Sequence, residues 1–504
     1  TNNQKTDTAR GDTIKRPLPK HNNDQKPPAD AEERPAPPQP KSKHLEVFLW
    51  TTLSMLGSLV LLTHTAYITS DIAPVPLLWI APLAIYLITF ILVFASPVFY
   101  RPGLFTYSWP ILTILEMIMG EHYLTARIGL NLLNIFLLCM ICHGELAICK
   151  PPAERLPLYW LCTSIGGVLG GLLVSVAAPL AFNFNLERQL TLGFMIVVSL
   201  MIISRGQIFL FGYKPFSYTW VGWSSFTLLI LLIGSVIHTE EFVHRERNFY
   251  GCVQVVKSDS SSRALVNGQV MHGMQWLSPE LQQVPLSYYQ LPIAFVDTYL
   301  RVRSRGAPVN YAVVGLGVGT IAAYGRSGDS IDFFEIDPKI VKIAKQFFYY
   351  LPNCKAKVNV LLGDARATFQ QLEQDKRYDV IIIDAFNGDA IPLHLCTEEA
   401  IKLYMAHLNP DGILLFHVSN RYIHLKPPIT SSARKLGLQP LGLDDRHSVY
   451  LLLTRKPEDI SSLKKVASEN KEQLEGLTLT EISEGKAKGW TDDFADLIRY
   501  FKLK

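Results

Sequence analysis

The chain has 504 residues, of which 48% are hydrophobic and 18% are charged, and its formal net charge is +4 at pH 7. Its mean hydropathy of +0.17 is high for a soluble enzyme, and the apolar excess lies in the first half of the chain. Because the net charge is so small, we do not expect a nucleic acid as partner.

Residues 1–44 predict a disordered, proline-rich tail. They contain no apolar run, and Pro35-Ala36-Pro37-Pro38-Gln39-Pro40 favours a stiff, extended chain. Charges are spread along the whole segment without an evident cleavage site, which argues against a signal peptide.

Residues 45–240 predict an α-helical domain that crosses a membrane about six or seven times. Several of its apolar runs approach the ~20 residues that span a bilayer. The candidate spans are 46–66, 77–95, 104–120, 128–147, 158–180, 190–204 and 222–238.

Four ionisable residues lie toward the ends of these runs: His64, Glu116, His143 and Glu145. An ionisable residue at membrane depth is a functional candidate, but a long side chain near a span end can reach the headgroups. We therefore expect headgroup contact rather than a role in transport, and His143 and Glu145 are the pair to test first. The seven cysteines match neither a zinc site nor a disulfide framework, and no metal is expected.

Residues 249–300 predict a small β-domain followed by a substrate gate, with a turn at Val266-Asn267-Gly268-Gln269. Residues 301–456 alternate strand and helix patterns. This alternation predicts a doubly wound, Rossmann-like α/β domain of the methyltransferase type, with an antiparallel final strand. The strands are expected at 311–314, 330–336, 358–362, 380–384 and 413–418, and the closing hairpin at 438–442 and 449–453.

A glycine-rich turn and three acids mark the strand ends of this α/β domain. The turn contains Gly315, Gly317 and Gly319. Glu335, Asp364 and Asp384 each end an apolar run, and ligands bind at the carboxyl ends of strands in such sheets. Glu335 could bind a ribose and Asp364 the amine of a base, which leaves Asp384 facing the reacting group. This pattern predicts an adenosyl site, unless the acids merely cap helices or terminate strands.

Glu335-Ile336-Asp337-Pro338, Gly363-Asp364-Ala365 and the strand that ends at Asp384 resemble the polyamine aminopropyltransferases, the spermidine synthase family. The resemblance implies that Gly315, Gly317, Gly319, Glu335, Asp337, Asp364 and Ala365 bind the donor, that Asp384 and Asp389 are catalytic, and that Tyr288, Tyr289 and Gln290 bind substrate. The segments Thr69–Trp79, Cys142–Leu146 and Trp490–Phe494 resemble the membrane-fused bacterial subgroup of this family.

The chain departs from the family pattern where the substrate would be held. Val318 replaces the acid that binds the aminopropyl ammonium, and Asn387 replaces a second acid, although Asp389 lies two residues further on. Each lost charge-assisted hydrogen bond should weaken binding of a dicationic amine by more than about 1 kcal/mol.

Three functions therefore stay open. The chain could transfer an aminopropyl or related alkyl group from decarboxylated S-adenosylmethionine to an amine, or a methyl group from S-adenosylmethionine. It could also be a non-catalytic membrane module that senses or transports a polyamine or an adenosyl compound. A small amine and the lipid bilayer are the expected partners, and homodimer formation stays open.

Residues 457–504 predict a charged, helical C-terminal segment as far as Trp490. Trp490-Thr491-Asp492-Asp493-Phe494 could fold over the site as a lid or begin a capped helix with a tryptophan in the core. The two interpretations stay open.

Basic residues alternate between the loops and place the N-terminus in the cytoplasm, with Lys41 and Lys43 before the first span and Lys150 and Arg155 after the fourth. Seven spans would put the α/β domain outside the cell, whereas six or eight spans would put it in the cytoplasm. Because an adenosyl site needs its cofactor, we expect a multi-pass protein of the inner membrane with a cytoplasmic catalytic domain.

Overall fold

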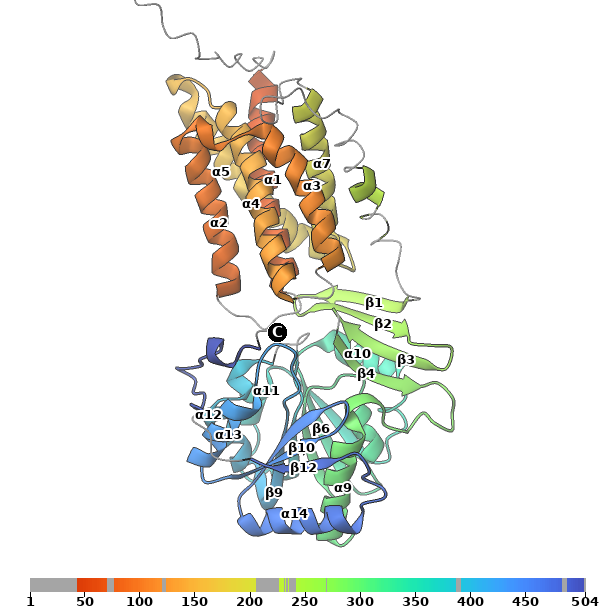
Figure 1. Cartoon of the computed structure of the whole chain (residues 1–504). Helices are drawn as coiled ribbons and strands as arrows, with labels where there is room; N and C mark the ends of the chain where they lie inside the picture. The colour runs from red at the N-terminus through yellow and green to blue at the C-terminus, as the bar shows by residue number, and fades with distance from the viewer. Residues whose placement is uncertain are drawn as a thin grey trace, which may run out of the picture. The chain divides into compact units, whose positions relative to one another are not determined.

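The computed structural model describes residues 43–69, 77–119, 124–204, 226–230, 232, 234, 242–268, 270–386, 391–482 and 487–502. Almost all of the predicted tail, up to residue 42, lies outside these ranges. The first part of the described chain is helical (Figure 1). Its helices are α1 (Lys43–Thr69), α2 (Leu77–Ala95), α3 (Pro102–Met119), α4 (Leu124–Ile148), α5 (Leu156–Leu172), α6 (Ala178–Ala181) and α7 (Glu187–Ser204).

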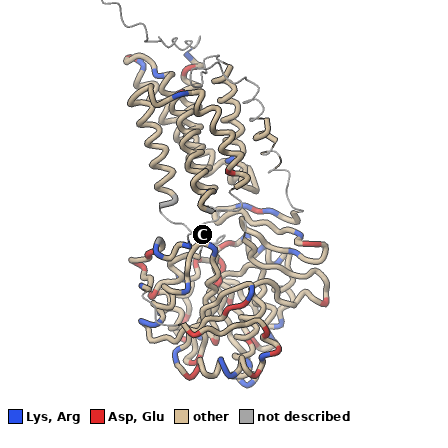
Figure 2. The backbone as a smooth tube through the Cα atoms, in the orientation of Figure 1, with Lys and Arg blue, Asp and Glu red and all other residues tan. Residues whose placement is uncertain are grey.

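Six of the seven predicted spans coincide with these helices, and the run 222–238 lies mostly outside the described residues. A π-helical turn, Leu173–Ala177, joins α5 to α6, so the fifth predicted span is continuous in the structure. Four helical segments are long and apolar enough to cross a membrane: Lys43–Thr69, Thr125–Ile148, Ala153–Ala181 and Glu187–Ser204. Charged residues are sparse along α1–α7 and frequent in the part of the chain that contains the sheets (Figure 2).

The expectation that the four ionisable residues of the helices reach toward headgroups is wrong. His64, Glu116, His143 and Glu145 are all buried among the helices. Glu116 accepts hydrogen bonds from Asn131 and Asn134 of α4 and forms an ion pair with Arg188 of α7, at 2.8 Å. The other three are also bonded internally, because Tyr100 donates to Glu145, Nδ1 of His143 lies 3.0 Å from the Thr89 hydroxyl, and Nδ1 of His64 lies 3.1 Å from the Val60 carbonyl oxygen. Both carboxylates therefore have protein partners, whereas Nε2 of His64 and Nε2 of His143 are buried without a hydrogen-bond partner among the described residues.

The small β-domain is a four-stranded antiparallel sheet in the order β1-β2-β3-β4. Its strands are β1 (Phe242–Asn248), β2 (Gly251–Lys257), β3 (Ser262–Asn267) and β4 (Val270–Trp276). The sheet begins at Phe242, earlier than the predicted residue 249. A short 3-10 turn, η4 (Ser287–Tyr289), and helix α9 (Leu291–Ser304) lead from this sheet into the α/β domain.

The α/β domain contains an eight-stranded sheet in the order β12-β10-β11-β9-β8-β5-β6-β7. Its strands are β5 (Asn310–Val314), β6 (Ser330–Glu335), β7 (Lys357–Leu362), β8 (Tyr378–Ile383), β9 (Leu408–His417), β10 (Gln439–Asp444), β11 (Val449–Thr454) and β12 (Thr478–Glu481). The five central strands pair in parallel, as predicted, and the closing hairpin is antiparallel to β9. Helices α10 (Pro338–Phe347), α11 (Ala365–Gln370), α12 (Glu398–Ala406), α13 (Lys426–Lys435) and α14 (Pro457–Glu469) complete the domain.

Strands β5 and β8 are buried on both faces, which is why they appear in the sequence as continuous apolar runs. Ile381 and Ile383 of β8 pack into one hydrophobic cluster, whereas Ile382 between them packs into another on the opposite face. Successive strand residues point to opposite faces, so a sheet covered by helices on both sides needs apolar residues at every position.

The prediction of a helical segment between residues 457 and 490 is only partly right. Helix α14 is followed by β12, a strand that extends the large sheet. Trp490 is completely buried in the hydrophobic cluster that contains Ile401 of α12 and Ala433 of α13. It therefore belongs to the core, and residues 491–494 form a bridged turn rather than a helix start.

Candidate active site

The glycine-rich turn directly follows β5, and all three of its glycines have positive φ angles. These are +95° at Gly315, +54° at Gly317 and +83° at Gly319, a region that side chains strongly disfavour. A Cβ atom on Gly315 would lie 2.3 Å from the carbonyl oxygen of Asp384, and one on Gly317 would lie 2.6 Å from that of His272. The glycines therefore allow the turn to pack against the end of β8 and against β4.

Glu335 ends β6, and both of its carboxylate oxygens accept backbone hydrogen bonds, one of them from this turn. One oxygen accepts the backbone N–H of Leu316 and the other that of Asp337, each at 2.9 Å. Burial raises the pKa of Glu335 above its ordinary value, although these N–H donors act in the opposite direction. Each carboxylate oxygen can accept a second hydrogen bond, so a ribose hydroxyl could still bind here.

Asp337 and Asp364 both cap helices, which for Asp364 is the alternative interpretation given above. Asp337 accepts the backbone N–H of Lys339 in α10 and the Asn248 amide, and Asp364 accepts the N–H of Ala367 in α11. Ala365 is the buried first residue of α11. A capping role does not exclude ligand binding, but it accounts for these two acids even if no ligand binds to them.

Asp364 differs from Asp337 in being partly exposed. Its second carboxylate oxygen lies 2.8 Å from Nε2 of His394, and its side chain is 36% exposed. Burial alone would raise the pKa of Asp364, but the Ala367 N–H and His394 lower it below its ordinary value. The carboxyl is therefore an ionised acceptor at neutral pH, which suits the predicted contact with an exocyclic amine.

Asp384 follows β8 and is paired with a histidine that the sequence interpretation did not identify. Oδ1 of Asp384 lies 2.7 Å from Nδ1 of His417, the last residue of β9, and both side chains are buried. The two residues are 33 positions apart in sequence but end adjacent parallel strands. His417 could have been found by the rule used for the acids, because it also terminates an apolar run.

Tyrosines surround this pair. The Tyr288 ring stacks on one side of the His417 ring, at a centroid distance of 4.6 Å, and the Tyr450 ring on the other, at 4.7 Å. The hydroxyl of Tyr289 lies 3.1 Å from that of Tyr288. Burial, together with the negative charge of Asp384, raises the pKa of all three tyrosines, so they are neutral hydrogen-bond donors at physiological pH.

The structure brings Tyr288 and Tyr289 to the predicted catalytic acid but leaves Gln290 outside. The Gln290 side chain is exposed and donates to the backbone carbonyl of Pro285. Asp389 lies among residues 387–390, outside the described part of the chain. His272 of β4 was not predicted, yet its imidazole interacts electrostatically with both Asp384 and His417.

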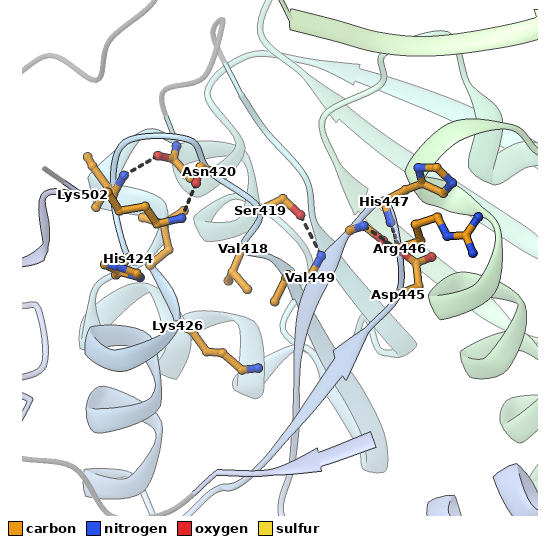
Figure 3. Close-up of a pocket in the computed structure, with 13 residues that line it drawn as sticks. Val418, Ser419, Asn420, His424, Lys426, Asp445, Arg446, His447, Val449 and Lys502 are labelled. Atoms are coloured by element: carbon orange, nitrogen blue, oxygen red, sulfur yellow. Dashed lines mark hydrogen bonds between the residues drawn. The ribbon is translucent and has the colours of Figure 1, made fainter. Parts of the chain in front are cut away.

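A cavity of about 380 Å³ lies next to this edge of the sheet, where the chain leaves β9 and enters β11 (Figure 3). Asn420, His424 and Lys502 lie on one side of it, and Asp445, Arg446 and His447 on the other (Figure 3). Its thirteen lining residues include three permanent cations, with Lys426 as the third, and one acid. Such a lining does not supply the several carboxylates that a dicationic amine needs.

Part of this chain is similar to known proteins. Residues 313–439 match the family model of the spermine/spermidine synthase domain. A polyamine aminopropyltransferase of Vibrio vulnificus is 26% identical over 212 residues, which are 40% of this chain and 68% of that protein. Residues 313–439 therefore carry a spermine/spermidine synthase domain, which supports a transferase.

Two further similarities are to a methyltransferase and to a solved structure. An N-terminal histidine N-methyltransferase of Emericella nidulans is 36% identical over 126 residues, which are 24% of this chain and 22% of that protein. The crystal structure of a probable spermidine synthase from Corynebacterium glutamicum aligns with 15% identity and a TM-score of 0.39, over 51% of this chain and 98% of that structure.

Proposed function

We propose that the chain is a membrane-anchored transferase that moves an aminopropyl or related alkyl group from an S-adenosyl sulfonium donor to an amine. The observation that carries the proposal is the buried Asp384, which lies at the same sheet edge as the glycine turn and Glu335, in a domain of the spermine/spermidine synthase family. A carboxylate at this edge would lie beside the reactive carbon of a donor bound at the carboxyl ends of the strands.

The acids at the ends of β6 and β7 fit an adenosyl donor. Glu335 has free acceptor positions for a ribose, and Asp364 is an ionised and partly exposed acceptor for the adenine amine. Both side chains are already oriented by hydrogen bonds to backbone or to His394, so little side-chain freedom would be lost on binding.

The reaction would be an in-line displacement at the carbon attached to sulfur. The protein would contribute mainly by holding the amine and the donor in line, which can lower a barrier by about 7–11 kcal/mol. The attacking amine must be neutral, because an ammonium group has no lone pair. Asp384 and the groups around it would orient the amine and accept its proton.

The acceptor need not be a polyamine. Val318 is completely buried and lies against β4, where a Cβ on Gly273 would be 2.5 Å from the valine side chain. The position that holds an ammonium in the family therefore offers only methyl groups. Together with the predominantly cationic lining of the cavity, this favours an amine with a neutral or anionic group over a dication.

Methyl transfer from ordinary S-adenosylmethionine is the second candidate. An acid at position 318 would repel the carboxylate of the methionine moiety, and Val318 removes that repulsion. The similarity to an N-methyltransferase over 126 residues supports this alternative for the cofactor-binding half of the site.

We further propose that the helical part is a multi-pass anchor in the inner membrane and that the catalytic domain faces the cytoplasm. Four helices of sufficient length and apolar composition support the anchor. An adenosyl donor is made inside the cell, so the cytoplasmic side is where the site could be used.

The test is to incubate purified full-length protein with each donor and a panel of amines and to identify products by mass spectrometry. The panel should contain diamines, monoamines and amino acids, with Asp384→Asn as the matched variant. Aminopropylated product that depends on Asp384 would support the first candidate, and methylated product the second. Tight donor binding without any product would favour the sensing or transport module.

A further inference from the structure

The proposed reaction needs a group that accepts a proton, and His417 has a ring nitrogen that bonds to no residue in the described part of the chain. Its Nε2 atom is buried and has no hydrogen-bond partner there, whereas its Nδ1 atom is 2.7 Å from Asp384. A buried, unpaired polar atom costs free energy, so it is expected to meet a ligand in the working protein.

The contact with Asp384 determines which nitrogen of His417 carries the proton. An ionised carboxylate can only accept hydrogen bonds, so Nδ1 must donate. In the neutral ring, Nε2 then carries the lone pair and can accept a proton. The sequence distance of 33 residues is bridged by the sheet, because Ile383 of β8 pairs with Phe416 of β9.

The ring is also held in one orientation. Tyr288 and Tyr450 stack on its two faces with interplanar angles of 15° and 24°, and Phe386 contacts it edge-on at 5.1 Å. Rotation of the imidazole would require at least one of these rings to move. Nε2 is therefore directed by packing as well as by Asp384.

We propose that Nε2 of His417 accepts the proton of the attacking amine and that Asp384 is a positioning residue. This inference rests on the proposed function and deepens it. The amine nitrogen forms a bond to the transferred carbon, the carbon–sulfur bond breaks, and its electron pair stays on sulfur as a neutral thioether. The proton moves from nitrogen to Nε2, and the resulting imidazolium is stabilised by the Asp384 carboxylate until the proton passes to water.

The surrounding titratable groups do not compete for that proton. Tyr288 and Tyr289 from η4 and Tyr450 from β11 stay neutral, because burial and Asp384 raise their pKa values. His272 from β4 also stays neutral, because burial lowers its pKa to about 4. Asp384 is the charged group that faces the ring among these neighbours.

The decisive variant is His417→Asn. The asparagine amide can still donate to Asp384 in place of Nδ1–H, but the variant has no counterpart of Nε2. We expect kcat to fall roughly 100- to 10,000-fold, the usual contribution of a general base, and the acid limb of the pH profile to disappear. The affinity for methylthioadenosine, measured by calorimetry, should change less than about threefold, which shows that the fold is intact.

His407→Asn is the matched control. His407 is also buried and contacts a backbone carbonyl through Nδ1, but it lies before β9, at the opposite end of that strand. Its replacement should leave kcat and the pH profile unchanged. A His417→Asn variant that keeps more than half of the activity with an unaltered acid limb would overturn the proposal.

A second measurement separates this proposal from the proposed function. Nitrogen-15 NMR of the histidine rings, with methylthioadenosine bound, should show His417 with the proton on Nδ1 in its neutral form. A ring with the proton on Nε2 would overturn the role of His417, whether or not turnover is found. Absence of transfer by the native protein with every donor and amine would instead refute the proposed function.

Discussion

Replacing Glu335 with glutamine tests the donor site directly. Both carboxylate oxygens accept backbone N–H groups, from Leu316 and Asp337, and the predicted ribose contact uses the remaining lone pairs. A glutamine offers one oxygen and one NH₂ group, so one backbone donor would face another donor. Loss of a charge-assisted hydrogen bond to the ribose should weaken binding by about 1.5–3 kcal/mol. That corresponds to a roughly 10- to 100-fold higher Kd for methylthioadenosine.

The same substitution should also destabilise the fold, since it leaves a buried backbone N–H unpaired at a cost of about 1–3 kcal/mol. Asp332→Asn separates the two effects. Asp332 is a buried carboxylate on the same strand, bonded to Asn359, Lys376 and Tyr378 instead of the glycine turn. We expect this control to lower the free energy of unfolding without changing the Kd.

Calorimetric titration with methylthioadenosine and chemical denaturation of both variants measure these quantities. An affinity of Glu335→Gln equal to that of the native protein would refute the ribose assignment. Equal losses of affinity in both variants would also refute it, because general destabilisation would then explain the result.

Four other predictions follow from the structure. Val318→Asp should raise the preference for decarboxylated over ordinary S-adenosylmethionine at least about tenfold, and a native protein that already selects the decarboxylated donor roughly a thousandfold would contradict this. The pKa of His272 is lowered to about 4, below its unfolded value near 6.5, so the free energy of unfolding should decrease as the pH is lowered from about 6.5 to about 4. Chemical denaturation should show this slope, and His272→Gln should remove it. Trp490→Ala should lower the free energy of unfolding by about 3–5 kcal/mol with unchanged donor affinity. If Trp490 belonged to a lid, the substitution would weaken donor binding and leave the free energy of unfolding unchanged. A reporter active only in the periplasm, fused after Lys504, should be inactive, and its activity would contradict the cytoplasmic placement.

Strands β5 and β8 could be predicted from the sequence because they are buried on both faces. Runs such as Val380–Ile383 are unbroken by polar residues and end in a residue with a function or a cap. Strand β12 could not be predicted in this way. It is an edge strand of four residues, Thr478–Glu481, and it is mostly exposed, so its pairing with β10 leaves no apolar pattern.

The site could be predicted only in part, because its key contact joins Asp384 to His417, which are 33 residues apart in the sequence. The positions of Glu335 and Asp384 at strand ends follow from the sequence, but the partner of Asp384 comes from another strand. The capping roles of Asp337 and Asp364 are local and could have been predicted from the residues that follow them, Pro338 above all.

In the helical region, the burial of Glu116 could not be predicted from the sequence. Glu116 lies near a span end, from where its side chain could have extended to a headgroup, and nothing in its neighbourhood predicts a partner. Its cation, Arg188, is 72 residues away on another helix. The distinction between an exposed and a buried acid depended on how these helices pack.

The contact between the small sheet and the glycine turn has a consequence for how this enzyme could be recombined with its relatives. Gly317 approaches the backbone of His272, and Gly273 approaches Val318, so the junction is formed by glycines of both partners. A chimaera that takes the small sheet from one protein and the turn from another would succeed only if each parent has glycine at its side of the junction. The small sheet and the glycine turn should therefore be taken from the same parent. A breakpoint for shuffling should be placed before Phe242 rather than between β4 and β5.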